Sequence, residues 1–262
     1  MVLLVSEFRP DSCVVAEVKA SPNHNERKGG AKPDMLVLHY TGMADTNAAI
    51  RRLCSPGSDV STHYVVLEDG RIIQCVPEAR RAWHAGVAAW GGETDINSCS
   101  IGIEIANPGH DHGYPDFPRR QIAAVIALCR SIFTHHRIPA HRVLAHSDVA
   151  PARKQDPGEK FPWWLLHESG IGLWVKPKAI TQGGRIFALG DRDPEVEALQ
   201  KSLADFGYGL AVTGNYDAET MAVVAGFQRH YRPTRVDGVA DVSTVTTLKA
   251  LIAARGKPPP ES

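Results

Sequence analysis

Segments with the patterns of strands and helices alternate along the first two thirds of this 262-residue chain, and only helix-like segments follow. Four short apolar runs bounded by turn residues predict strands. They lie at residues 35–40, 62–67, 71–76 and 100–106. Strands that alternate with helices predict an α/β fold, in which helices cover a mixed central sheet.

The clearest helical pattern in this part of the chain lies at residues 119–133. Its apolar residues recur three or four positions apart, as they do on one face of an amphipathic helix. They are Ile122, Val125, Ile126, Cys129, Ile132 and Phe133. We expect this helix to pack on the sheet.

The C-terminal third is predicted to be a separate helical domain. Residues 176–188 carry proline and paired glycines without periodicity, which is typical of a linker. Beyond them, Asp193, Asp217 and Asp241 each precede a helical pattern, as N-capping aspartates do. The expected organisation is an α/β domain at 1–175, a linker at 176–188, a three-helix domain at 189–256 and a tail at 257–262.

The predicted helical domain contains a short internal repeat. Residues 214–220 and 238–244 resemble each other, and both place a capping aspartate shortly after a glycine turn. The apolar residues expected to face inward are Val196, Leu199, Leu203, Met221, Val224, Phe227, Leu248, Leu251 and Ile252.

Charge balance and hydropathy argue against two classes of partner. The chain has 29 basic and 29 acidic residues, so no broad electrostatic field favours binding to nucleic acid or to an anionic membrane. No run of 18 apolar residues predicts a transmembrane helix, and the first ten residues lack the basic region of a secretory signal.

The five cysteines show no CxxC spacing, and we expect them to be small buried hydrophobes.

Twelve histidines is a high count, and most are expected to have no functional role. Those in polar or turn-rich surroundings are expected at the surface. They are His24, His110, His112, His135, His136, His141 and His230. Two others, His39 and His146, each end an apolar run beside a loop, where α/β sheets place their sites.

Charged residues near these two histidines could supply further chemistry. Glu104 interrupts an apolar strand, where it is either an exposed residue or a general base for a metal-bound water. Asp148 and Asp156 both follow His146, and spacing alone does not choose between them as a third ligand. Two imidazoles and a carboxylate suit zinc and leave a position for a water whose pKa falls toward about 7. Lys154 would stabilise an oxyanion, or it is a solvated loop lysine.

These residues lie in segments that resemble the type 2 N-acetylmuramoyl-L-alanine amidases, which are similar to phage amidases and animal peptidoglycan-recognition proteins. The segments occur in the family's order and are Leu38–Thr41, Val60–Tyr64, Ala82–Gly86, Ile101–Ile105 and His146–Gly158. The resemblance implies a zinc hydrolase that cleaves the amide bond between the lactyl group of N-acetylmuramic acid and L-alanine.

The resemblance also implies which residues hold zinc and carry out the reaction. It places the zinc ligands at His39, His146 and Asp156, the catalytic acid/base at Glu104 and a transition-state stabiliser at Lys154. Only the resemblance selects Asp156 over the other aspartate.

For the remaining site residues, the resemblance implies supporting roles. Tyr40, His84 and Asn107 are expected to bind substrate, and Asp148 is expected to be structural. His63 lies in a family motif, but we interpret it as a packed strand histidine.

Two departures from the phage and animal relatives are informative. Thr62 stands where those relatives tend to have a tyrosine near the metal, and Asp156 stands where they have a cysteine. Both indicate a likeness to bacterial amidases of the recycling and envelope types.

The C-terminal helices resemble the small three-helix peptidoglycan-binding domain. The motifs lie at residues 199–203, 206–208, 216–220, 224–228 and 237–238. The alternative is a helical appendage that contacts only the catalytic domain.

The expected partner is peptidoglycan or a soluble anhydro-muropeptide, and the chain is expected to be monomeric. A wall-binding domain favours the cell envelope or periplasm, whereas the lack of a visible signal favours the cytoplasm.

Two rival functions follow from the same residues. Some peptidoglycan-recognition proteins bind muropeptide without cleaving it, but these lose a zinc ligand and this chain retains all three. A zinc hydrolase that acts on a different amide is the second rival.

Overall fold

The computed structural model of the protein describes residues 8–181 and 183–255. The tail expected at 257–262 and one residue of the expected linker lie outside this part. Among the described residues, no helix combines the length and the apolar character needed to cross a bilayer.

The chain divides into two compact units. The first comprises Met1–Gly86 and Asp95–Leu144, and the second comprises Val87–Thr94 and the residues from Ala145 onward. This division groups residues 145–175 with the C-terminal helices, whereas the sequence places them with the α/β part. The boundary expected near residue 175 therefore stays a prediction.

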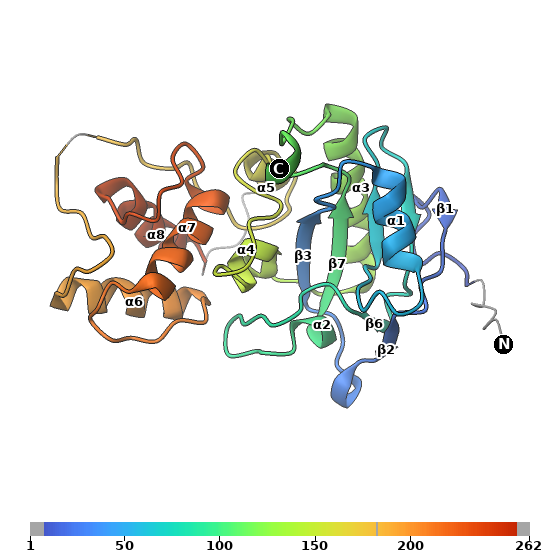
Figure 1. Cartoon of the computed structure of the whole chain (residues 1–262), viewed down its shortest axis with the longest axis horizontal. Coiled ribbons are helices and arrows are strands. Elements are labelled where there is room, and N and C mark those ends of the chain that lie inside the picture. The colour runs from blue at the N-terminus through green and yellow to red at the C-terminus, as the bar shows by residue number, and fades with distance from the viewer. Residues whose placement is uncertain (1–7, 182, 256–262) are drawn as a thin grey trace. The chain divides into compact units, whose positions relative to one another are not determined.

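A six-stranded sheet organises the first unit (Figure 1). In order across the sheet, its strands are β1 (Glu17–Val18), β5 (Ile72–Gln74), β4 (Tyr64–Val66), β7 (Ser100–Ile105), β3 (Met35–Tyr40) and β8 (Val143–Ala145). β4 pairs antiparallel with β5, whereas β7 pairs parallel with both β3 and β4. A separate antiparallel pair consists of β2 (His24–Glu26) and β6 (Arg80–Ala82). The mixed sheet confirms the predicted fold class.

Helices cover the two faces of this sheet (Figure 1). α1 (Thr46–Cys54) buries Ile50 and Leu53 in a cluster with Val65 of β4. α3 (Arg119–His135), the helix predicted at 119–133, buries its apolar stripe on the opposite side. A third, short helix, α2 (Ile96–Cys99), leads directly into β7. The apolar sides of α1 and α3 thus cover the two faces of the sheet. The candidate polar residues lie near the ends of β3 and β7.

The parallel register of β3 and β7 sets two of the candidate residues beside each other. His39 is the direct partner of Glu104, so their side chains leave the sheet on the same face. Gly102 lies two residues before Glu104 on that face, and a Cβ there would lie 2.5 Å from the ring of His84. Glycine at this position therefore allows the His84 ring to lie directly against the strand.

The second unit contains the helical part of the chain. Its helices are α4 (His146–Val149), α5 (Trp163–Glu168), α6 (Pro194–Phe206), α7 (Ala218–Tyr231) and α8 (Val242–Ala254). The last three confirm the prediction of three C-terminal helices. Each follows its expected aspartate, and the carboxylates of Asp193, Asp217 and Asp241 accept hydrogen bonds of 2.7–2.8 Å from first-turn backbone N–H groups.

Buried glutamines give the predicted internal repeat a structural basis. The side-chain oxygen of Gln200 in α6 accepts hydrogen bonds of 2.8 and 2.9 Å from the backbone N–H groups of residues 213–214. The oxygen of Gln228 in α7 accepts bonds of 3.0 and 2.9 Å from residues 237–238 in the same way. Each glutamine thus holds the glycine turn that precedes the next capping aspartate, which confirms the repeat.

Two residues that were expected to be buried are exposed. Ile252, expected in the helical core, is 39% exposed because it lies on the outer side of the last turn of α8. Cys13, expected to be buried, lies exposed in the turns that precede β1. Cys75 and Cys129 are buried as expected.

Candidate active site

A series of hydrogen bonds leads from His39, the first candidate metal ligand, through His84 to Ser100. Its ring is only 1% exposed, and its Nε2 lies 3.1 Å from Nδ1 of His84. Nε2 of His84 lies 3.1 Å from the hydroxyl oxygen of Ser100, and that hydroxyl donates to the carbonyl oxygen of Ile96 at 2.5 Å. Four groups on β3, β7 and the segments beside them are thus connected in series.

The direction of this chain determines which nitrogen of His39 can bind a metal ion. The hydroxyl proton of Ser100 is engaged with a carbonyl, so the hydroxyl oxygen accepts the Nε2 proton of His84. His84 then accepts at Nδ1 the Nε2 proton of His39. Nδ1 of His39 is left unprotonated, which is the state in which imidazole binds a metal. His84, expected to bind substrate, is therefore also placed to orient His39.

The segment after β8, which begins with α4, carries the other two candidate ligands. Nδ1 of His146 lies 2.9 Å from Oδ2 of Asp156, and both residues are buried. The backbone N–H of Ser147 donates to the Asp156 carbonyl oxygen at 3.0 Å, which holds the loop back against α4. Asp148 turns elsewhere, since its carboxylate accepts a 2.8 Å hydrogen bond from the backbone N–H of Ala145. The structure thus separates the two aspartates that sequence spacing left as alternatives.

His39, His146 and Asp156 each offer one ligand atom, and these three atoms lie within 4.8 Å of one another. Two ligands of one tetrahedral zinc ion lie about 3.3 Å apart, given bonds of about 2.0 Å. Small side-chain adjustments therefore suffice for all three to reach one ion. Two imidazole nitrogens and a carboxylate oxygen are also a donor set that catalytic zinc sites use. The residues present fit zinc.

Glu104 is the expected catalytic acid/base, and Lys154 is the expected stabiliser of the transition state. Glu104 is half-buried on the sheet face that also carries His39. Lys154 lies in the loop between His146 and Asp156, where its backbone N–H donates to the Ala150 carbonyl oxygen at 3.0 Å. The Lys154 side chain is partly exposed. Their roles in the reaction stay predictions.

Tyr40 and Asn107 organise the loop that follows β7. The Tyr40 hydroxyl lies 3.0 Å from Nδ1 of His110, and the His110 ring stacks on Tyr114 with centroids 4.1 Å apart. Asn107 donates from its amide to the Pro115 carbonyl oxygen at 2.9 Å and accepts at 2.9 Å from the next-but-one backbone N–H. These contacts stabilise the loop, and the substrate-binding role of both residues stays a prediction.

His63 is packed and buried, as expected, but it lies directly before β4 and not within the strand. Its Nδ1 accepts a hydrogen bond of 2.9 Å from the backbone N–H of Gly102, and its Nε2 lies 3.0 Å from the Arg80 carbonyl oxygen. Burial, together with the positive charge of Arg27, lowers the pKa of His63 to about 3. The folded protein therefore holds this ring neutral.

We expect His63 to make stability depend on pH. Because its pKa is lower in the folded state than in the unfolded state, unfolding takes up a proton below about pH 6.5. Its contribution is complete above that pH and falls by about 1.4 kcal/mol per unit as the pH drops toward 3. Urea unfolding of the metal-free protein at pH 7 and pH 5 measures the effect. The loss should be about 2 kcal/mol smaller in His63→Gln, and equal losses would contradict this assignment.

His230, expected at the surface, is a correction, because it is 2% exposed. It lies in α7 with its ring stacked between those of Trp163 and Tyr231, each with a centroid distance of 3.7 Å. The expectation relied on its polar neighbours in sequence. The helical spacing indicates burial, because His230 lies three residues after the inward-facing Phe227 and therefore on the same face of the helix.

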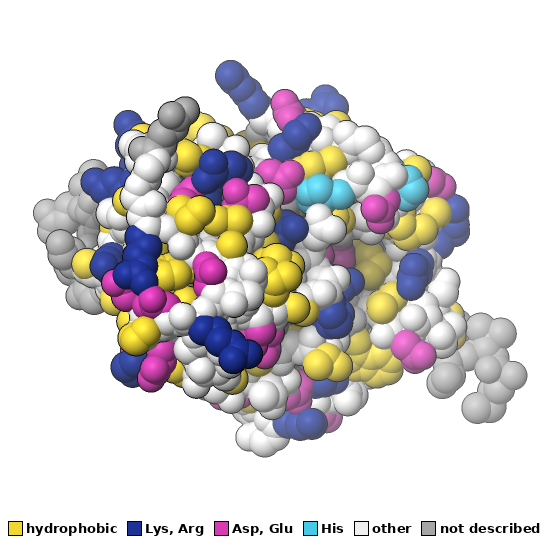
Figure 2. All heavy atoms as spheres, turned by 60° about the vertical axis from the view of Figure 1, so that its left-hand side comes forward, with side chains coloured by type: hydrophobic (Ala, Val, Ile, Leu, Met, Phe, Trp, Pro, Cys, Tyr) yellow, Lys and Arg dark blue, Asp and Glu magenta, His cyan; other side chains and the backbone are white. Residues whose placement is uncertain are grey.

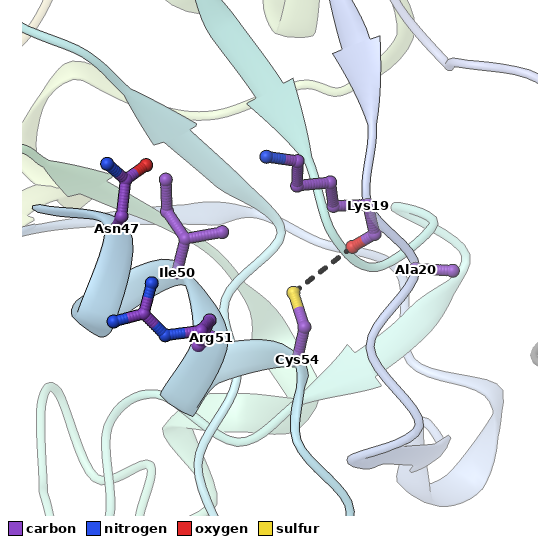
Figure 3. A pocket seen from close by; sticks show the side chains of 6 residues that line it. All are labelled: Lys19, Ala20, Asn47, Ile50, Arg51 and Cys54. Atoms are coloured by element: carbon purple, nitrogen blue, oxygen red, sulfur yellow. Dashed lines mark hydrogen bonds between the residues drawn. The ribbon is translucent and has the colours of Figure 1, made fainter.

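A hollow of about 420 Å³ lies beside α1 in the first unit. Cys54 points into it and donates from its thiol to the Lys19 carbonyl oxygen at 3.2 Å (Figure 3). The hollow is lined by Lys19, Ala20, Asn47, Ile50, Arg51 and Cys54. None of these is a candidate site residue, so the hollow is separate from the proposed chemistry.

Two protein families match the chain in consecutive parts. The N-acetylmuramoyl-L-alanine amidase family matches residues 29–159, and the peptidoglycan binding domain family matches residues 192–248. The N-acetylmuramoyl-L-alanine amidase AmiD of Escherichia coli (strain K12) is 36% identical over 239 residues, which cover 85% of this chain and 83% of that protein. The 1,6-anhydro-N-acetylmuramyl-L-alanine amidase AmpD of Citrobacter freundii is 34% identical over 161 residues, which cover 55% of this chain and 83% of that protein.

Solved structures show the same relationship. The Escherichia coli AmiD structure, a complex with anhydro-N-acetylmuramic acid-L-Ala-D-gamma-Glu-L-Lys, has a TM-score of 0.73 at 34% identity and covers 90% of this chain and 99% of that one. AmpDh3 from Pseudomonas aeruginosa has a TM-score of 0.71 at 31% identity and covers 86% of this chain and 93% of that one. Together with the family matches, these similarities show that the chain belongs to the N-acetylmuramoyl-L-alanine amidase family, with a peptidoglycan-binding domain after its amidase domain.

Proposed function

We propose that this enzyme hydrolyses the bond between the lactyl group of N-acetylmuramic acid and L-alanine with a zinc ion held by His39, His146 and Asp156. The convergence of these three buried donors within 4.8 Å is the observation that carries the proposal. Bound zinc would polarise the scissile carbonyl and lower the pKa of a bound water toward about 7.

The protein's own residues would then move the protons. Glu104, on the same sheet face as His39, accepts the proton of the attacking water and returns it to the departing alanine nitrogen. Lys154 places its ammonium group beside the carbonyl oxygen as that oxygen becomes negative. His84 keeps His39 in the tautomer that binds metal.

We infer that the substrate is a muropeptide or the peptidoglycan from which it derives. The related Escherichia coli enzyme was solved with an anhydro-muropeptide as its substrate. Basic and acidic side chains are interspersed on the face seen in Figure 2, so that face offers no single-sign surface for a polyanion. The peptidoglycan-binding domain favours action at the cell envelope, and we expect the enzyme to work there as a monomer.

Mass spectrometry of the products tests this function. The zinc-loaded protein should release a free stem peptide with an L-alanine N-terminus from anhydro-muropeptide and leave anhydro-N-acetylmuramic acid. Parallel digestion of intact sacculi would show whether polymeric peptidoglycan is also a substrate. Cleavage at another amide would establish the rival hydrolase, and binding without any release, together with the absence of bound zinc, would establish the rival binding protein.

A further inference from the structure

We infer that Tyr208, in the segment after α6, and His230, in α7, are positioning residues for the metal-ligand segment His146–Asp156, and that they act through Asp148. The inference rests on the proposed zinc site. It gives the C-terminal helices a role in the catalytic centre that is separate from binding peptidoglycan.

Asp148 is a fully buried carboxylate with three hydrogen bonds. Its Oδ2 accepts from the backbone N–H of Ala145 at 2.8 Å and from Nδ1 of His230 at 2.6 Å. Its Oδ1 accepts from the hydroxyl of Tyr208 at 2.8 Å. Two of the three donors therefore come from the C-terminal helical part of the chain.

The third donor shows what the carboxylate holds in place. Ala145 precedes His146 directly, so its bond to Asp148 fixes the first turn of α4, in which His146 is the first residue. Ser147, also in that turn, donates to the carbonyl oxygen of Asp156. A shift of Asp148 would therefore move both His146 and Asp156.

The two C-terminal donors have little freedom to move. His230 is stacked between two aromatic rings at centroid distances of 3.7 Å. The Tyr208 ring packs against Trp90 at 4.9 Å, and the backbone of Gly91 donates to the Gly207 carbonyl oxygen at 2.7 Å. Burial and the nearby Asp148 carboxylate raise the pKa of Tyr208, which keeps the hydroxyl a donor. Rigid donors of this kind fix the position of their acceptor.

A glycine brings α7 against the ligand helix. At Gly226, a Cβ would lie 2.6 Å from the Ser147 carbonyl oxygen and 3.2 Å from Cβ of Pro151. Only glycine permits this approach of α7 to the backbone of α4. The contact is independent of the hydrogen bonds and leads to the same conclusion, that the C-terminal helices form part of the support of the ligand segment.

Zinc affinity in a matched pair of variants of the full-length chain tests this role. Tyr208→Phe and Tyr216→Phe each remove one buried hydroxyl from the helical part, but the Tyr216 hydroxyl donates to the Gly238 carbonyl oxygen at 2.7 Å and does not reach Asp148. Loss of an outer partner of a metal site typically costs 10–100-fold in affinity. We expect the zinc dissociation constant, measured by competition with a chelating dye, to rise about tenfold in Tyr208→Phe and less than about twofold in Tyr216→Phe.

Rescue by metal provides the second measurement. Activity of Tyr208→Phe should recover as free zinc is raised, whereas Tyr216→Phe should need no additional zinc. Thermal unfolding of the metal-free variants checks that both fold. An unchanged dissociation constant in folded Tyr208→Phe, or equal changes in both variants, would overturn the inference alone. Failure of the unaltered chain to bind zinc would overturn the proposed function and this inference with it.

Discussion

Replacing Glu104 with glutamine is expected to lower kcat by about 10²–10⁴-fold, which corresponds to about 3–5 kcal/mol in the activation barrier. The amide keeps the size of the side chain but cannot take a proton from water. Glu104 is not among the three grouped ligand residues, so zinc affinity should change little. Stopped assays of muropeptide cleavage and a zinc titration on the same preparation measure both quantities.

Glu197→Gln is a suitable control, because it makes the same chemical change at an exposed position on α6. It should leave both rate and zinc affinity as they are. Near-normal kcat in zinc-loaded Glu104→Gln would show that another group transfers the proton.

Replacing Asp156 with alanine is expected to weaken zinc binding by more than about a hundredfold and to abolish activity at ordinary zinc concentrations. Two histidines would remain, which is too few ligands for a stable catalytic zinc site. Equilibrium dialysis against buffered zinc measures the affinity directly. The substitution also removes the 2.9 Å contact with His146, so the second ligand loses its orientation.

Asp45→Ala controls for the loss of an aspartate, since Asp45 caps α1 and is exposed. Its zinc affinity should equal that of the unaltered chain. If Asp156→Ala retained zinc while Asp148→Ala lost it completely, the third ligand would have to be reassigned to Asp148.

The sequence predicted best those elements whose signals are local. The strand at 35–40 and the three capping aspartates of the C-terminal helices agree with the structure, because a short apolar run and N-cap chemistry depend on neighbours a few residues away. Strands β1, β2 and β6 have two or three residues each and were not predicted. Such segments are too short to show an alternation, and only pairing with distant strands makes them strands.

The candidate site was only partly predictable for a related reason. Strand ends drew attention to His39 and His146, but spacing could not choose between Asp148 and Asp156. That choice depends on where the loop turns back, which the Ser147 to Asp156 hydrogen bond fixes. The link from His84 to Ser100 was missed, because a serine at the start of a strand has no distinctive pattern in sequence.

The close approach of α7 at Gly226 bears on how enzymes of this kind could exchange domains. A foreign wall-binding domain grafted after residue 175 would supply affinity for glycan, yet it would place a side chain where only a hydrogen fits and would lack the donors that meet Asp148. Recombination at this point would thus create a misfit unless the incoming helix matched the surface of α4. In this chain the C-terminal helical part is therefore not an independently exchangeable domain, because its Gly226, Tyr208 and His230 pack directly on the segment that carries His146 and Asp156.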